Sequence, residues 1–195
     1  MNRTALHWLG RSLVVAAAAL STACAGDAPL GLDGPTASPA QLTLGAPAGA
    51  EPDLGSCQHL RVPAGSAFTF HAYARGVQIY RWNGTSWLPV GPSAVLYADA
   101  TGKGVVGTHY AGPRWQSLSG STVVGSVLDR CTADASAIQW LLLAAEPEGG
   151  PGVFQHTAFI QRVNTVGGKP PSAGGSLGEL KEVPYTAEYF FYRAP

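Results

Sequence analysis

From residue 57 onward, turn-forming residues interrupt the chain at short and regular intervals. Glycine contributes 25 and proline 15 of the 195 residues, and both residue types are unfavourable inside helices. The apolar segments between them, such as AVLYAD, GVVGTHY and STVVGSVLD, have the length of strands. About ten such segments follow one another at a spacing of about ten residues. The sequence therefore predicts an all-β fold, an antiparallel β-sandwich or flattened barrel of about ten short strands.

The clearest local signal is a hairpin in the segment GVQIYRWNGTSWLPVG, residues 76–91. Apolar and polar residues alternate up to Asn83-Gly84, a pair typical of the two positive-φ positions of a type I′ turn. Trp82 and Trp87 flank this turn, and we expect them to pack across it. Just before the hairpin, the residues on one side of SAFTFHAYA are apolar and should face the core, namely Phe68, Phe70, Ala72 and Ala74.

Two further segments carry less alternation. The apolar run AIQWLLLAA, residues 137–145, fits a strand buried on both faces or a short helix. We favour the strand. Aromatic residues occupy both faces of VPYTAEYFFYR, residues 183–193, which predicts a strand covered on both sides. A longer segment, GVFQHTAFIQRVNT, predicts a bent or bulged strand.

Residues 1–23 have the features of an export signal: basic residues at Arg3 and Arg11, a short apolar run and small residues at the end. The apolar run is too short to span a bilayer. It ends in LSTAC, which resembles a bacterial lipobox with Cys24 as the lipidated residue, although Ser21 replaces the usual large aliphatic residue. Cleavage after Ala23 or Ala25 without lipidation also fits the small residues. We expect a cell-envelope protein held at the membrane by its N-terminal lipid, and otherwise a periplasmic or secreted one.

Residues 24–55 are rich in alanine, glycine and proline and predict a flexible tether, followed by a β-domain over residues 56–195. The chain has three cysteines. If Cys24 carries a lipid, Cys57 and Cys131 remain as one possible disulfide pair in an oxidising compartment. Two unpaired thiols are the alternative, and we favour the disulfide.

Charge excludes one class of partner. Only 12% of the residues are charged, and lysine and arginine form no cluster. Because nucleic-acid binding requires a concentrated basic surface, we expect no nucleic-acid partner.

Five segments, in their order along the chain, resemble a family of secreted bacterial and fungal proteins classed as a domain of unknown function. They are VPAGSAFTFHAYARGVQIYRW, VVGTHYAGPRW, IQWLLLAA, QRVNTVGGKPP and VPYTAEYFFY. The resemblance covers about residues 59–193 and implies one exported domain. Some family members carry a malate dehydrogenase label, but this chain has no glycine-rich dinucleotide fingerprint and no alternation of strands with helices.

The segment GTHYAGPRWQ, residues 107–116, gathers the best candidates for a site. A non-enzymatic module would bind an unknown ligand or surface partner there through Tyr110, Arg114 and Trp115, because aromatic and charged groups beside a turn suit recognition. The alternative is a hydrolase that uses His109 with Arg114 or Glu188. We expect Glu188 to pair with Arg114 or Arg162. The histidines lack ligand spacing, so we expect neither a metal nor another cofactor.

Overall fold

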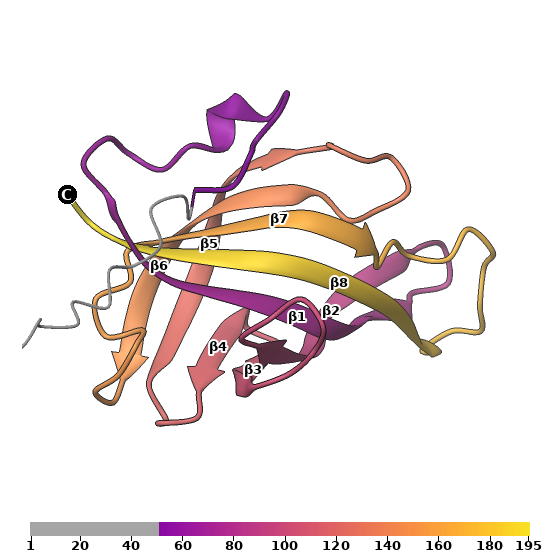
Figure 1. The fold of residues 1–195 in the computed structure, drawn as a ribbon. Coiled ribbons are helices and arrows are strands. Elements are labelled where there is room, and N and C mark those ends of the chain that lie inside the picture. The colour runs from indigo at the N-terminus through magenta and orange to yellow at the C-terminus, as the bar shows by residue number, and fades with distance from the viewer. Residues whose placement is uncertain (1–50) are drawn as a thin grey trace, which may run out of the picture. The chain divides into compact units, whose positions relative to one another are not determined.

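A computed structural model describes residues 51–195. The predicted export signal, Cys24 and residues 24–50 of the predicted tether lie outside the described residues. The described part consists of eight strands and one short 3₁₀ helix (Figure 1). In chain order these are η1 (Gln58–Leu60), β1 (Ala67–Trp82), β2 (Trp87–Tyr97), β3 (Val105–Tyr110), β4 (Arg114–Ser117), β5 (Thr122–Cys131), β6 (Trp140–Gly149), β7 (Phe159–Gly167) and β8 (Leu180–Arg193). Among residues 51–195, no helix is long and apolar enough to cross a membrane.

Each strand pairs antiparallel with the next, and β8 pairs with β1, so the sheet closes on itself. This confirms the predicted all-β antiparallel class. The ring is irregular because β4 has only 4 residues whereas β1 has 16. A short β4 leaves the second half of β5 with a ladder partner only on the β6 side.

The number of strands is lower than the expected ten, for a reason visible in β1. Two segments predicted as separate strands join there into one, and Gly76 lies at the junction. A Cβ atom on Gly76 would lie 2.1 Å from the carbonyl oxygen of Ser93. The glycine therefore allows close approach of β2 and does not break the strand. Residues 153–156, predicted as the start of a bulged strand, form a turn, and β7 begins at Phe159.

Two local expectations are confirmed, and a third, the type of one turn, is wrong. The apolar run at residues 137–145 supplies strand β6, as favoured. The β1–β2 hairpin also forms, and the rings of Trp82 and Trp87 pack with their centroids 5.3 Å apart. Its predicted type I′ turn is wrong, because Gly84 has a positive φ but Asn83 does not. Instead the Asn83 side-chain oxygen accepts hydrogen bonds from the backbone N–H groups of Thr85 and Ser86.

Inward-facing side chains fill the ring and form the main core. Three of the four predicted apolar residues of β1 belong to it or pack against it, namely Phe70, Ala72 and Ala74. Phe68 does not, because a register shift between Phe68 and Phe70 changes the face on which it lies. The largest fully buried members are Trp115, Leu96, Leu143, Phe154, Ile160, Tyr189 and Phe191.

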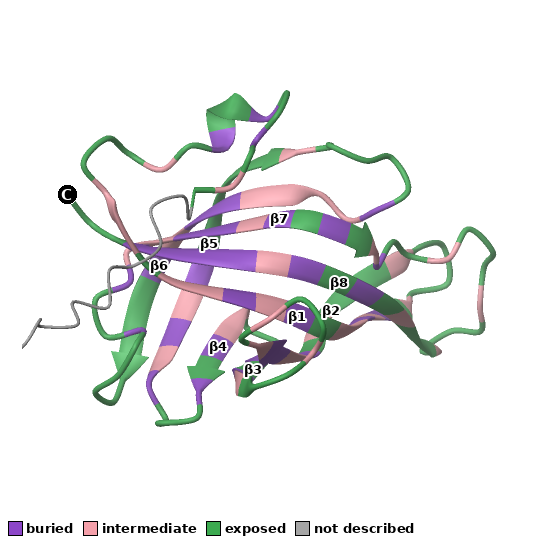
Figure 2. Cartoon of the chain, in the orientation of Figure 1, coloured by how far each residue is buried: buried purple, intermediate pink, exposed green. Residues whose placement is uncertain are grey.

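A second core lies on the outer face of the ring, under residues 51–63, which we call the N-terminal strap. Phe190 and Tyr192 of β8 contribute to it, whereas their neighbours Tyr189 and Phe191 point into the ring. Figure 2 shows that the C-terminal part of β8 is buried almost without interruption. The prediction of a last strand covered on both sides is therefore confirmed.

The strap is held by side-chain packing and by a covalent bond. Leu54 and Leu60 are buried in the second core, although Leu54 lies in the stretch predicted as tether. A disulfide joins Cys57 of the strap to Cys131 at the end of β5, as predicted. The strap is thus part of the folded unit from at least Leu54 onward.

Candidate functional site

The β3–β4 hairpin positions two aromatic side chains inside the ring. Residues 111–113 form its turn, and the register pairs His109 with Trp115 and Tyr110 with Arg114. Paired residues of an antiparallel ribbon point to the same face, and successive residues point to opposite faces. His109 and Trp115 therefore face inward together, and Tyr110 and Arg114 face outward.

His109 is held as a neutral side chain. Only 2% of its surface is exposed, and its ring stacks on Trp115 with the centroids 4.2 Å apart. Burial is the main cause that lowers the pKa of His109 to about 3. Nδ1 lies 2.8 Å from the carbonyl oxygen of Arg114. Because a carbonyl can only accept, Nδ1 carries the proton and Nε2 keeps a free lone pair.

Arg162 of β7 brings a positive charge into the same space. It is paired in register with Tyr189, which lies in the inner core, and with Leu141, which packs against that core. Its Nε and one Nη donate to the carbonyl oxygen of Gln139 at 3.2 and 2.8 Å. Within residues 51–195 no carboxylate forms an ion pair with Arg162.

These side chains line a cavity of about 100 Å³ beside the β3–β4 turn. It lies beyond Arg114, the first residue of β4, where the second half of β5 has no ladder partner on the β4 side among the described residues. Most of its walls are apolar. Its lining residues are Pro92, His109, Pro113, Trp115, Val127, Leu141, Leu143, Arg162 and Tyr189.

Several polar atoms at or near this cavity are buried without a hydrogen-bond partner in the described chain. Two of them belong to cavity-lining residues, the indole Nε1 of Trp115 and the hydroxyl of Tyr189. The hydroxyl of Tyr185, whose side chain faces the same interior, is a third. Burial raises the pKa of both tyrosines, so both phenols keep their protons at neutral pH. Within residues 51–195, the indole N–H of Trp115 is thus a donor without a partner, whereas the hydroxyls of Tyr185 and Tyr189 lie close to each other and the hydroxyl of Tyr189 lies close to Arg162.

The predicted site residues divide between the two faces of the ring. His109 and Trp115 line the cavity, whereas Arg114 forms an exposed ion pair with Glu148, with Nε to Oε2 at 2.7 Å. Tyr110 shares the outward face of Arg114.

Glu188 lies on the outer face of β8, and its expected pairing with Arg114 or Arg162 is wrong. Its Oε2 lies 2.9 Å from Nε2 of His71, and its Oε1 accepts a hydrogen bond from Asn164 at 3.0 Å. Alternation along β8 explains the difference, because Tyr189, the partner of Arg162, faces inward and its neighbour Glu188 must face outward. His109, Arg114 and Glu188 therefore do not converge on a common point.

Sequence reasoning missed Tyr189 as a site residue and considered Arg162 only as a partner for Glu188. Arg162 lies two residues after Ile160, which is fully buried in the inner core. That two-residue spacing is the available signal, because it places an arginine on the apolar face of β7.

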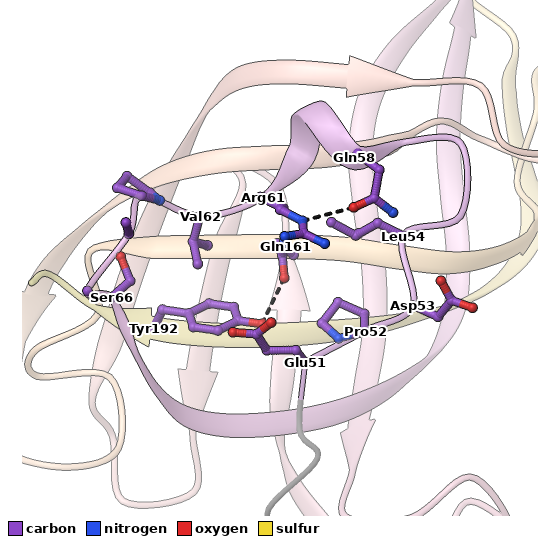
Figure 3. A pocket seen from close by; sticks show the side chains of 13 residues that line it. Glu51, Pro52, Asp53, Leu54, Gln58, Arg61, Val62, Ser66, Gln161 and Tyr192 are labelled. Carbon is purple, nitrogen blue, oxygen red and sulfur yellow. Dashed lines mark hydrogen bonds between the residues drawn. The ribbon is translucent and has the colours of Figure 1, made fainter.

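A larger cavity of about 310 Å³ lies under the strap (Figure 3). At its base, the buried amide of Gln161 donates to the carbonyl of Leu60 and accepts from the hydroxyl of Tyr192. Its lining begins at Glu51, the first described residue. The polar groups of Gln161 and Tyr192 satisfy one another, and within residues 51–195 Ser66 Oγ is the buried polar side-chain atom of this lining without a partner. Because the smaller cavity combines an unpaired indole N–H with an arginine and apolar walls, it is the better candidate site.

Comparison with known proteins gives one match. A family model described as a protein of unknown function (DUF3455) matches residues 63–193. The matched range contains every residue that lines the smaller cavity, whereas most of the strap lies outside it. Neither the curated proteins nor the solved structures gave a match. Among residues 51–195, no three His, Cys, Asp or Glu side chains gather as metal ligands would.

Proposed function

The chain belongs to the DUF3455 family of proteins of unknown function, and from that premise we propose that its barrel is a small-molecule-binding module of the cell envelope. The ligand occupies the cavity lined by His109, Trp115, Arg162 and Tyr189. The module is exported and tethered through a lipid on Cys24.

One observation carries the proposal of binding. The cavity has apolar walls and a fully buried donor without a partner in the described residues, the indole N–H of Trp115, beside the hydroxyl of Tyr189 and the guanidinium of Arg162. A buried donor left unpaired costs about 1–3 kcal/mol, and apolar walls with a few convergent polar groups are typical of ligand sites. A ligand with acceptor atoms would recover that free energy. Eight-stranded antiparallel barrels are wide enough to hold one small ligand.

The geometry favours binding over hydrolysis. A hydrolase built on His109 would need a second catalytic group within hydrogen-bond reach of the same substrate atom. Arg114 and Glu188 point away from His109, to the outer face. A neutral imidazole with a pKa of about 3 is also a weak base at neutral pH.

The envelope location is supported by the disulfide between Cys57 and Cys131. Disulfides persist in oxidising compartments and are rare in the cytosol. The signal-like residues 1–23 point to the same side of the membrane.

Binding can be tested through the indole N–H resonance of Trp115, assigned with Trp115→Phe. We would titrate the protein with small acids, amides and alcohols at millimolar concentrations. At least one should shift this resonance saturably. Val127→Phe should abolish the shift, because Val127 lines the cavity. Leu128→Phe is the matched control, because Leu128 is exposed and lies outside the lining. The proposal fails if no compound shifts the resonance, or if Val127→Phe leaves the shift unchanged.

A further inference from the structure

We infer that the ligand of this cavity is a small monocarboxylate whose carboxylate pairs with Arg162. This inference deepens the proposed function and rests on it.

Among residues 51–195, no carboxylate balances the charge of Arg162. Its side chain points into the ring beside Tyr189, and its hydrogen bonds go to the carbonyl of Gln139. A guanidinium has five N–H donors, so several stay available. Glu188, the acid expected as a partner, is engaged with His71 and Asn164, and Glu148 pairs with Arg114. Arg162 is half-buried and faces an apolar interior, where a charge is stabilised by a partner, and a carboxylate matches the planar fork of arginine.

The other polar groups of the cavity select the same chemistry. The indole of Trp115 can only donate, and the hydroxyl of Tyr189 keeps its proton. An ionised carboxylate only accepts, so it can use both donors together with Arg162. A cationic ligand would be repelled by Arg162. In the described chain, Arg162 is the one charged side chain of the lining, because His109 stays neutral. The single positive charge of Arg162 balances the charge of a monoanion, whereas it balances only half of the charge of a dianion such as phosphate.

The size and the walls of the cavity define the rest of the ligand. A volume of about 100 Å³ corresponds to roughly three waters in the liquid. Beyond the carboxylate it leaves room for a short or flat apolar group. The stacked rings of His109 and Trp115 supply a flat wall, and Leu141 supplies an aliphatic one. Val127, which is 41% exposed, marks the side on which a longer ligand could extend into solvent.

The test compares acids with neutral compounds of the same shape. Propionate is paired with propionamide and benzoate with benzamide, and each is titrated at constant ionic strength while the Trp115 indole N–H resonance is followed. At least one acid should bind about tenfold or more tightly than its amide, because charge-assisted hydrogen bonds are roughly twice as strong as neutral ones. Potassium chloride at the same concentration should not displace the acid.

Variants of Arg162 separate the charge from its geometry. Arg162→Gln should weaken binding of the acid by about tenfold or more, and Arg162→Lys should give an intermediate loss, because lysine keeps the charge without the fork. If Arg162→Gln does not fold, the affinity of Arg162→Lys for the acid still tests the inference. The matched control, Arg81→Gln, removes an exposed arginine elsewhere on the barrel and should bind like the wild type.

The outcomes distinguish this inference from the proposed function. If the amides bind as well as the acids, or if Arg162→Gln and Arg162→Lys bind the acid like the wild type, the carboxylate inference is wrong and the cavity is still a binding site. If the acid binds but chloride displaces it, the site takes small anions unspecifically and the inference is also wrong. If neither acids nor amides move the Trp115 resonance, the carboxylate inference fails, and the proposed function then depends on the other compounds of the broader titration.

Discussion

The imidazole of His109 lies parallel to the indole of Trp115, with 9° between the ring planes, while its Nδ1 hydrogen-bonds to the carbonyl of Arg114. All three residues belong to one hairpin. A burial of this kind fixes the protonation state of the histidine, and it makes the stability of the fold depend on pH.

The stability of the protein should fall with acidification in a range set by His109. Its pKa is about 3 in the folded state, against an ordinary value of 6.5 in the unfolded chain. Between these values the unfolded state binds more protons, so stability is highest above pH 6.5 and is lost as pH falls toward 3. The loss at pH 5 should be about 2 kcal/mol, at about 1.4 kcal/mol per pH unit. Chemical unfolding at several pH values measures it.

His109→Gln is the control for this pH dependence, because glutamine can still donate to the carbonyl of Arg114 but does not titrate. On acidification to pH 5, the free energy of unfolding of this variant should fall by less than that of the wild type. The difference should equal the loss expected for His109. An NMR titration in which His109 protonates near pH 6.5 would contradict the expectation.

Removal of the disulfide should destabilise the fold without abolishing the barrel. Cys57 and Cys131 are 74 residues apart in sequence, and closing a loop of that size stabilises a protein by about 4 kcal/mol in the chain-entropy model. We expect the double variant Cys57→Ala/Cys131→Ala to lose a similar free energy of unfolding. Reduction of the wild type should reproduce the loss, and reduction of the variant should add nothing. An unchanged denaturation midpoint in the variant would show that packing alone holds the strap.

Substitutions at Asn164 should separate backbone strain from side-chain bonding. Its φ is +49°, a value that alanine adopts only at a cost, and its amide donates to Glu188. Asn164→Gly loses only the hydrogen bond, whereas Asn164→Ala also acquires the strain. The alanine variant should therefore be about 1 kcal/mol less stable than the glycine variant. Thermal and chemical unfolding compare the two, and equal stability would show that the backbone at residue 164 relaxes.

The lipid anchor is open to a direct test. Cys24→Ser should move the protein from the membrane fraction to the soluble extracytoplasmic fraction, because in our proposal a lipid on Cys24 supplies the attachment. Cys57→Ala/Cys131→Ala is the matched control, since it removes cysteines and leaves the proposed acylation site intact. The anchor is excluded if Cys24→Ser partitions like the wild type.

The sequence predicted the features that depend on neighbouring residues. Gly and Pro spacing indicated the antiparallel all-β class, and the aromatic residues on both faces of 183–193 indicated a strand covered twice. The hairpin at Asn83-Gly84 was predicted, but not its turn type, because an Asn side chain can cap several turns. The strand count was too high, because Gly76 marks a close approach of strands and not a turn.

The residues of the candidate site were predicted only in part, and the reason is the period of two along a strand. In GTHYAGPRWQ the length of the turn decides which residues share a face, and it sets His109 and Trp115 inside and Tyr110 and Arg114 outside. A register shift between Val163 and Val166 likewise determines which β7 residues face Glu188. The composition and alternation of the strands were local information, and the pairing of Cys57 with Cys131 was predicted by setting Cys24 aside. The closure of the ring, which brings Arg162 and Tyr189 to the stacked pair of His109 and Trp115, was decided by tertiary structure alone, because contacts between strands far apart in sequence follow from register and not from residue type.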